Sequence, residues 1–174
     1  MEIAPLSIAA SARRNGHHAW MARRLFELMG TSVATTSEHG PKLMLGRHCY
    51  HCAWHAELFA TLLPTPAEVH PYAVVGPPAA DVETLFASFE QVTTTADKLD
   101  AIYRVAVPMM LDRIREHRDQ CNPVTDAPTM RVLDLVVHDL TADVVEAEDL
   151  MATLVSSDTL QRSARSGEPL SGRS

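Results

Sequence analysis

Apolar residues recur every three or four positions over four long stretches of this chain, and this periodicity is the strongest constraint on its fold. The clearest stretch keeps a period of about 3.6 through Met130, Leu133, Val137, Leu140, Val144, Ala147, Met151 and Leu154. Glycine is scarce and runs of β-branched residues are short, which argues against strands. The sequence therefore predicts an all-α fold.

Turn residues and prolines mark the ends of the four predicted helices. We place these helices at about residues 17–32, 41–63, 96–120 and 127–155. The breaker pair Asn15-Gly16 is expected to precede the first helix. Pro108 lies inside the third predicted helix, so it should kink that helix or remove one of its backbone hydrogen bonds.

The connection between the second and third predicted helices is long. Its repeated prolines leave one short helical pattern, at residues 81–92. Short loops make the first and second helices antiparallel, and likewise the third and fourth, whereas this long crossover lets the second and third run parallel. We expect one domain at residues 1–155, followed by a mobile, polar tail at 156–174.

Composition and charge narrow the classes of function. A formal charge of −7, from 15 Lys and Arg against 22 Asp and Glu, gives no electrostatic reason to bind nucleic acid or an anionic membrane. No apolar run reaches the roughly 18 to 20 residues that span a bilayer, and the first residues do not resemble a secretion signal. The three cysteines cannot all pair within one chain, so we expect a cytoplasmic protein rather than a secreted disulfide scaffold.

Three histidines of the second predicted helix lie on its apolar stripe. His48, His51 and His55 occupy positions i, i+3 and i+7, in line with Leu45 and Phe59. Burying these rings costs free energy unless each nitrogen finds an acid, a hydroxyl, water or a metal ion. We therefore predict a polar cluster with a functional role inside the protein.

The same segment contains the C-x-x-C pair Cys49 and Cys52. Such a pair often indicates zinc or redox chemistry. Here no second C-x-x-C and no preceding strand accompany it, so we interpret both cysteines as small core residues.

The helix order and loop lengths of residues 17–155 resemble those of the ferritin-like superfamily, whose best-known members bind a di-iron centre. This resemblance implies a ferritin-like four-helix bundle with an extra short helix in the crossover. The Glu-x-x-His motif of that family is absent from the sequence. For this reason no iron ligand can be carried over position by position.

Matching the predicted helices level by level, to within about one turn or roughly 5 Å, adds candidates from the other helices. His51 and His138 fall in one layer, and His55, Asp112 and Asp134 in the next. Glu27 of the first helix lies near the level of His48. The candidate metal ligands are His48, His51, His55, Asp112, Asp134, His138 and Glu27, and the candidate catalytic residues are His51, His55, His138 and Asp134.

These candidates predict an enzyme that acts on a small-molecule substrate, with bacterial specialised metabolism as the expected setting. The cofactor stays open. Iron in a di-iron or His-rich mononuclear site would imply oxygen-dependent oxidation, and a metal-free cluster would serve proton transfer in an isomerisation, elimination or cyclisation. The alternative is a non-catalytic bundle that binds a ligand or partner and uses its histidines as a structural network. A homodimer through an exposed helix face is compatible with either function.

Overall fold

The computed structural model describes residues 6–64 and 71–166. Within these ranges the chain forms helices and no strands, which confirms the all-α prediction. The elements are α1 (Ile8–Thr35), α2 (His39–Thr61), the 3-10 turn η1 (Pro71–Val74), α3 (Ala80–Phe89), α4 (Thr95–Asp100), the π-helical turn η2 (Ala101–Ala106), α5 (Val107–Asp119) and α6 (Ala127–Ser166). None of the described helices is long and apolar enough to cross a bilayer.

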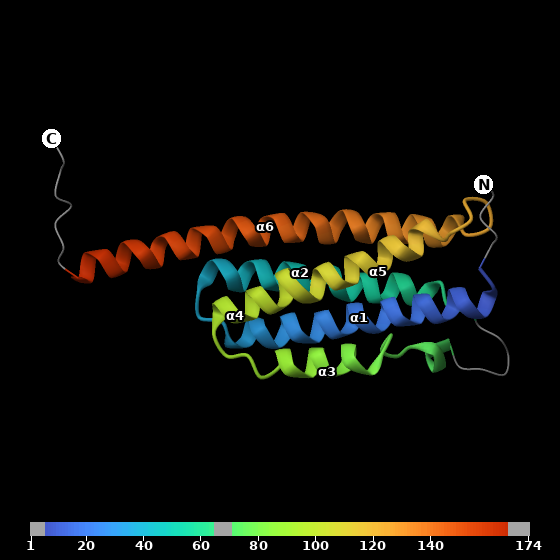
Figure 1. Cartoon of the computed structure of the whole chain (residues 1–174), viewed down its shortest axis with the longest axis horizontal. Helices are drawn as coiled ribbons and strands as arrows, with labels where there is room; N and C mark the ends of the chain where they lie inside the picture. Colours follow the sequence, from blue (N-terminus) through green and yellow to red (C-terminus); the bar gives the residue numbers. More distant parts are fainter. Residues whose placement is uncertain (1–5, 65–70, 167–174) are drawn as a thin grey trace.

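Four long helical segments pack as two antiparallel pairs (Figure 1). α1 lies along α2, and α5 lies along α6; α1 also contacts α5, and α2 also contacts α6. α2 and α5 run in the same direction because the chain between them returns along the length of the bundle, with α3 beside α1 (Figure 1). The four segments enclose one apolar core, to which each contributes fully buried side chains such as Leu25, Phe59, Met110 and Leu140.

The first helix begins earlier than the sequence suggests, and Asn15-Gly16 lies inside it. Ser7 caps the helix by accepting a hydrogen bond from the Ala10 backbone N–H at 3.2 Å. Glycine is required at position 16 because the crossover passes close by: a Cβ there would lie 2.2 Å from the carbonyl oxygen of Val74. The prediction of a helix break was therefore wrong, since this glycine marks a close approach of backbone rather than a helix end.

The third long segment is continuous through α4, η2 and α5, with Pro108 just after the π-helical turn. Proline has no N–H, and its ring crowds the carbonyl four residues earlier, which here belongs to Arg104. The preceding turn is widened, because the Val107 N–H donates to the carbonyl of Ile102, five residues back. The effect of Pro108 thus appears as a local π-helical turn, which contains Tyr103.

The remaining boundaries differ from the sequence prediction mainly at the C-terminus. α2 and α3 begin and end within a few residues of the predicted limits. α6 continues beyond the predicted end at residue 155 as far as Ser166, so the first part of the predicted mobile tail has a helical backbone. In Figure 1 this part of α6 extends past the other helices. Residues 167–174 lie outside the described ranges.

Substituting two of the helical glycines, Gly16 and Gly46, should have opposite effects. Gly16→Ala places a methyl group against the Val74 carbonyl, so we expect the free energy of unfolding to fall by about 1–3 kcal/mol. Gly46→Ala is the matched control, since no atom lies within 4 Å of its added Cβ, and it should stabilise the protein by about 0.5–1 kcal/mol. Urea unfolding measures both changes. Equal effects of the two substitutions would show that the crossover does not touch α1 at Gly16.

Candidate functional site

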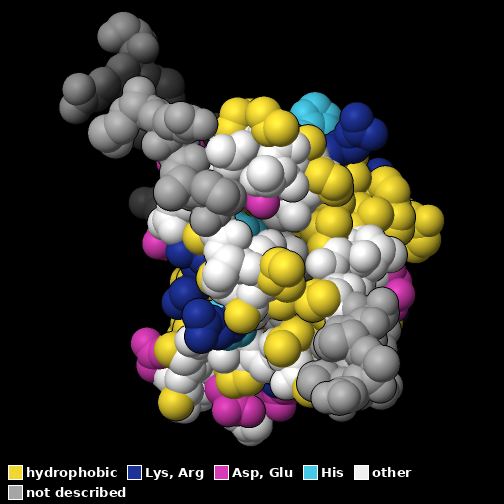
Figure 2. Space-filling view, turned by 90° about the vertical axis from the view of Figure 1, so that its right-hand side faces the viewer, with side chains coloured by type: hydrophobic (Ala, Val, Ile, Leu, Met, Phe, Trp, Pro, Cys, Tyr) yellow, Lys and Arg dark blue, Asp and Glu magenta, His cyan; other side chains and the backbone are white. Residues whose placement is uncertain are grey.

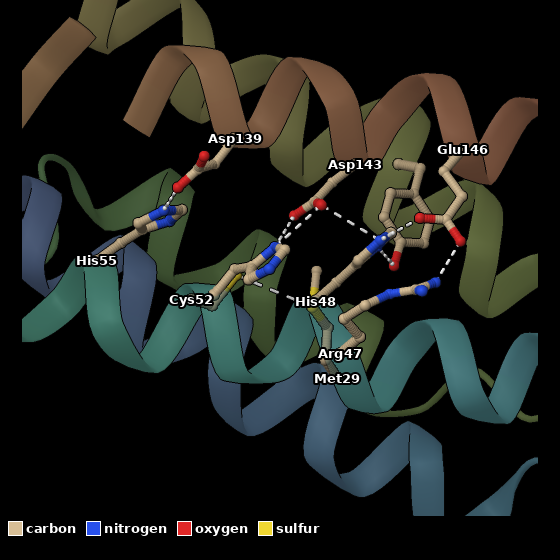
Figure 3. A network of polar contacts seen from close by, with 10 residues as sticks. Met29, Arg47, His48, Cys52, His55, Asp139, Asp143 and Glu146 are labelled. Atoms are coloured by element: carbon tan, nitrogen blue, oxygen red, sulfur yellow. Dashed lines mark hydrogen bonds and ion pairs between the residues drawn. The ribbon is translucent and has the colours of Figure 1, made fainter. Parts of the chain in front are cut away.

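A row of histidines on α2 faces a row of acids on α6 (Figure 3). We call this group the polar seam, and it consists of His48, His51, His55, Asp139, Asp143 and Glu146. Because α2 and α6 are antiparallel, the pairs follow in reverse order along the two helices, one pair on each of three successive turns. The seam therefore extends along the contact between these helices rather than lying at a single point.

The central pair of the seam is His51 with Asp143. Nδ1 of His51 lies 3.0 Å and 3.1 Å from the two carboxylate oxygens of Asp143. The Asp143 side chain is only 5% exposed, whereas that of His51 is 30% exposed. The carboxylate therefore holds the proton of the ring on Nδ1, and the other nitrogen, Nε2, is left free to act as a base.

His48 is fully buried and has partners at both ring nitrogens. Its Nε2 carries the proton and donates to Glu146 at 3.3 Å, and the same nitrogen lies 3.2 Å from an oxygen of Asp143, a close polar contact. Its Nδ1 accepts from the Tyr103 hydroxyl at 2.8 Å. Burial raises the pKa of Tyr103, so the hydroxyl keeps its proton for this hydrogen bond. Asp143 thus accepts a hydrogen bond from His51 and has the Nε2–H group of His48 close by.

His55 forms the third pair, with Asp139. Its Nε2 donates to the Asp139 carboxylate at 3.0 Å, and its Nδ1 is buried without a hydrogen-bond partner. Burial lowers the pKa of both His55 and His48, and the neighbouring acids oppose this effect only in part. Both rings are accordingly neutral near neutral pH.

The two cysteines of the C-x-x-C pair face α1 rather than the seam acids. Cys49 donates to the carbonyl of Phe26 at 3.4 Å, and the Cys52 sulfur lies 3.9 Å from that of Met29. Burial raises the pKa of both thiols, which keeps them protonated and weakens them as nucleophiles or metal ligands.

The other four predicted site residues lie outside the seam. Asp134 is exposed and pairs with Arg118 at 2.7 Å. Asp112 and Glu27 are likewise exposed and pair with arginines of their own helices, and His138 is exposed. The structure therefore brings together the three histidines of α2 but not Asp112, Asp134, His138 or Glu27.

The reason is the register between α2 and α6. Level matching placed His51 opposite His138, whereas its partner is Asp143, five residues further along α6. At a rise of about 1.5 Å per residue this error is roughly 7.5 Å, which exceeds one turn of helix. Residues 134 and 138 consequently fall at other levels and on the outer side of α6.

Four residues of the site were not predicted from the sequence: Tyr103, Asp139, Asp143 and Glu146. A signal for the three acids was present. They lie at i, i+4 and i+7, which is the spacing of the three histidines read in the opposite direction. Two antiparallel helices with such mirrored spacings can pair at every turn.

The seam does not fit the di-iron centre that the ferritin-like resemblance implies. Such centres take carboxylates and histidines from all four helices of a bundle. Here the polar side chains come from α2 and α6, with Tyr103 from η2, and α1 contributes Leu25 and Met29 to the core. Across residues 6–64 and 71–166, no group of three His, Cys, Asp or Glu side chains is placed to hold a metal ion.

An open hollow of about 590 Å³ lies on the side of α6 next to the seam. Residues of α6 between Val137 and Asp149 line it, and Glu146 belongs to both the hollow and the seam. Arg47 of α2 forms an ion pair with Glu146, which places a cation at the same edge. A small molecule resting in this hollow would meet the seam at Glu146.

Comparisons with known proteins gave no relative from which a role could be transferred: no family model, curated protein or solved structure matches the chain. The chemistry of the seam is therefore inferred from its own contacts.

Removing the Tyr103 hydroxyl should weaken the fold. In Tyr103→Phe, Nδ1 of His48 stays buried but loses its donor, so we expect the free energy of unfolding to fall by about 1–2 kcal/mol. Tyr50→Phe is the matched control, because Tyr50 is 69% exposed and should change stability by less than about 0.5 kcal/mol. Urea unfolding of the three proteins checks this, and an equal, small effect of both substitutions would contradict the hydrogen bond.

Acid should destabilise the protein through the buried rings of the seam. In the unfolded chain His48 and His55 take up protons near the ordinary pKa of 6.5, whereas in the folded protein burial lowers that pKa. Below about pH 6.5 the unfolded state therefore binds more protons, and its stability relative to the folded state rises. We expect the free energy of unfolding to fall by up to about 1.4 kcal/mol per pH unit for each ring.

Urea unfolding between about pH 7.5 and 5.5 measures this slope. His55→Gln should show a shallower decline than the wild type, because glutamine does not titrate. His138→Gln is the control, a histidine substitution at an exposed position of α6. Identical slopes in all three proteins would be incompatible with a neutral, buried His55.

Proposed function

We propose that this protein is an enzyme that transfers a proton to or from a small organic molecule, with His51 as the acid/base group. The observation that carries the proposal is the contact of Nδ1 of His51 with both oxygens of Asp143, at 3.0 and 3.1 Å. A buried carboxylate that orients a partly exposed imidazole is a recurring arrangement in acid/base catalysis. In this arrangement Nε2 accepts the proton, and Asp143 stabilises the imidazolium that forms.

His48 and Tyr103 act as positioning residues in this proposal. The Nε2–H group of His48 lies 3.2 Å from an oxygen of Asp143, and this polar contact favours the orientation of the carboxylate toward His51. Tyr103 in turn donates to His48 and so fixes which nitrogen of that ring carries the proton. The chain from Tyr103 through His48 to Asp143 therefore keeps His51 in one tautomer.

The surroundings of His51 suit an organic substrate. Tyr50 directly precedes His51 on α2, and Trp54 lies about one turn after it; these two side chains are 69% and 44% exposed. The Tyr50 ring centre lies 6.4 Å from that of His51, so an aromatic face borders the exposed imidazole. An apolar molecule with one acidic C–H would find both packing and a proton acceptor here, and the imidazolium that forms can return that proton to a leaving group or to another carbon of the same molecule. Isomerisation, elimination and cyclisation are the reaction classes that we propose.

We assign the scaffold to the ferritin-like bundles on its helix order. Two antiparallel pairs joined by a long crossover, with α2 and α5 parallel, support this assignment. We do not propose the di-iron chemistry that is usual for this scaffold. The seam takes its acids and histidines from α2 and α6 alone, and the third long segment adds only Tyr103.

A second function is favoured by the complete burial of His48 and His55. Rings that solvent cannot reach are well suited to a structural network that specifies how α2 packs on α6. In that case the bundle would bind a ligand or partner without catalysis, and His51 would serve stability alone.

The two functions differ in what His51→Gln does. Pools of small organic metabolites are incubated with the protein in D₂O, and mass spectrometry identifies any compound that gains deuterium or is converted. The enzyme proposal expects such a compound with the wild type and a loss of rate of about 10²–10⁴-fold in His51→Gln. His39→Gln is the matched control and should keep the wild-type rate, because His39 is an exposed histidine of α2 outside both the seam and the hollow beside it.

Either of two results would overturn the enzyme proposal. One is the absence of protein-dependent exchange or conversion in every pool. The other is a rate in His51→Gln equal to that in His39→Gln. The thermal midpoint of His51→Gln is measured in parallel. A large drop with no turnover in the wild type would favour the structural network.

A further inference from the structure

A second group of histidines lies at the end of the bundle where α1 begins and α5 ends. Figure 2 looks onto this end and shows Lys and Arg side chains gathered on one side of the face, with histidine beside them. A hollow of about 280 Å³ lies among these residues, and we call it the basic pocket. Its lining includes Arg13, Arg14, His17, His18, Arg113 and His117.

Positive charge is concentrated in the basic pocket. Among the described residues that line it, Glu116 is the one acid, against three arginines. No salt bridge joins Arg13, Arg14 or Arg113 to an acid among the described residues, and Arg14 instead donates to the side-chain oxygen of Gln120. Burial and the charges of Arg13 and Arg113 lower the pKa of His17. Such crowding in a chain with a net charge of −7 costs electrostatic free energy that a bound anion would offset.

The floor of the pocket contains a buried pair of imidazoles. Nε2 of His18 lies 3.1 Å from Nδ1 of His117, and the two side chains are only 3% and 1% exposed. The outer nitrogens, Nδ1 of His18 and Nε2 of His117, have no hydrogen-bond partner in the described protein. Burial lowers the pKa of His18 to about 3 and that of His117 to about 4, so both rings are neutral.

Two neutral imidazoles joined by one hydrogen bond share two N–H groups. One N–H makes the contact between the rings, and the other is left over on an outer nitrogen. An unpartnered buried N–H costs about 1–3 kcal/mol unless a ligand or water accepts it. Both rings line the basic pocket, so an acceptor bound there is placed to satisfy this donor.

We propose that the basic pocket binds a small molecule through an oxyanionic group, a phosphate or a carboxylate, held by Arg13, Arg113 and the spare N–H of the His18–His117 pair. Guanidinium groups bind the oxygens of both anions through paired, charge-assisted hydrogen bonds. A volume of about 280 Å³ is at the lower end of ligand pockets, which suits a metabolite rather than a polymer.

The basic pocket is separate from the polar seam. The Phe59 ring packs on His18, with ring centres 5.1 Å apart, and lies one turn of α2 beyond His55. The binding proposal therefore stands whether or not His51 is catalytic. A polyanion such as nucleic acid is disfavoured because the chain as a whole is acidic and the positive charge lies in a small hollow.

Isothermal titration calorimetry with inorganic phosphate, acetate and chloride, at matched ionic strength, tests the proposal on the full chain. We expect phosphate or acetate to bind at least tenfold more tightly than chloride, and the tighter of the two identifies the class of anion. Arg113→Gln should weaken that binding about tenfold or more, because it removes a charge-assisted donor. Arg115→Gln is the matched control on the same helix, since Arg115 is exposed and faces Asp112 instead.

An independent readout comes from the histidines. In ¹⁵N NMR spectra the tighter anion should shift the His18 and His117 ring nitrogens, while those of His51 stay unchanged. The proposal is overturned if neither anion binds better than chloride, if Arg113→Gln binds as tightly as Arg115→Gln, or if the His18 and His117 signals do not move. Arg113→Gln alters a partly exposed side chain, so its fold is expected to remain intact.

Discussion

The contact between α2 and α6 depends on one buried carboxylate, that of Asp143. Removing a charged group from water costs several kcal/mol unless hydrogen bonds replace its hydration. Here His51 donates to it, and the Nε2–H group of His48, on the preceding turn of α2, lies 3.2 Å from it. The Asp143 carboxylate therefore determines how the two helices pack, which tautomers these two rings adopt and how exposed His51 is.

This arrangement also specifies the register of the helices. A slip of α6 along α2 by one heptad would place Asp139 opposite His48, and would leave Val136 and Val132 opposite the other two histidines. An apolar contact tolerates such slips because one aliphatic side chain replaces another at small cost. A row of three histidine and acid pairs does not tolerate them, because every slip leaves buried polar atoms without partners.

The helical content and the limits of the middle helices follow from local sequence alone. Hydrophobic periodicity and prolines are local signals, and they place α2 and the third segment within a few residues. Gly16 was misread because its role comes from Val74, a residue far away in sequence, and no local pattern reports such a contact. The π-helical turn was predicted only in part. Pro108 predicts that a backbone hydrogen bond is disturbed, but it does not indicate how the helix accommodates the loss.

Only the histidine side of the candidate site could be predicted from the sequence. That His48 and His55 face inward follows from their place on an apolar stripe, and both are fully buried. Their partners were missed because the relative level of two helices depends on the lengths and paths of loops, which periodicity does not contain. Asp143 was also missed because it is an aspartate. Aspartates are mostly exposed, so one is predicted to be buried only when a hydrogen-bond donor is known to face it.

The widened turn Ala101–Ala106 has a consequence for the directions in which the residues around it point. A π-helical turn closes its hydrogen bonds between residues five apart instead of four, so it rotates the part of the segment before it relative to the part after it. Tyr103 sits within this turn. In a third segment that stayed α-helical throughout, residue 103 would point to another side, and its hydroxyl would no longer meet the His48 ring across the interior.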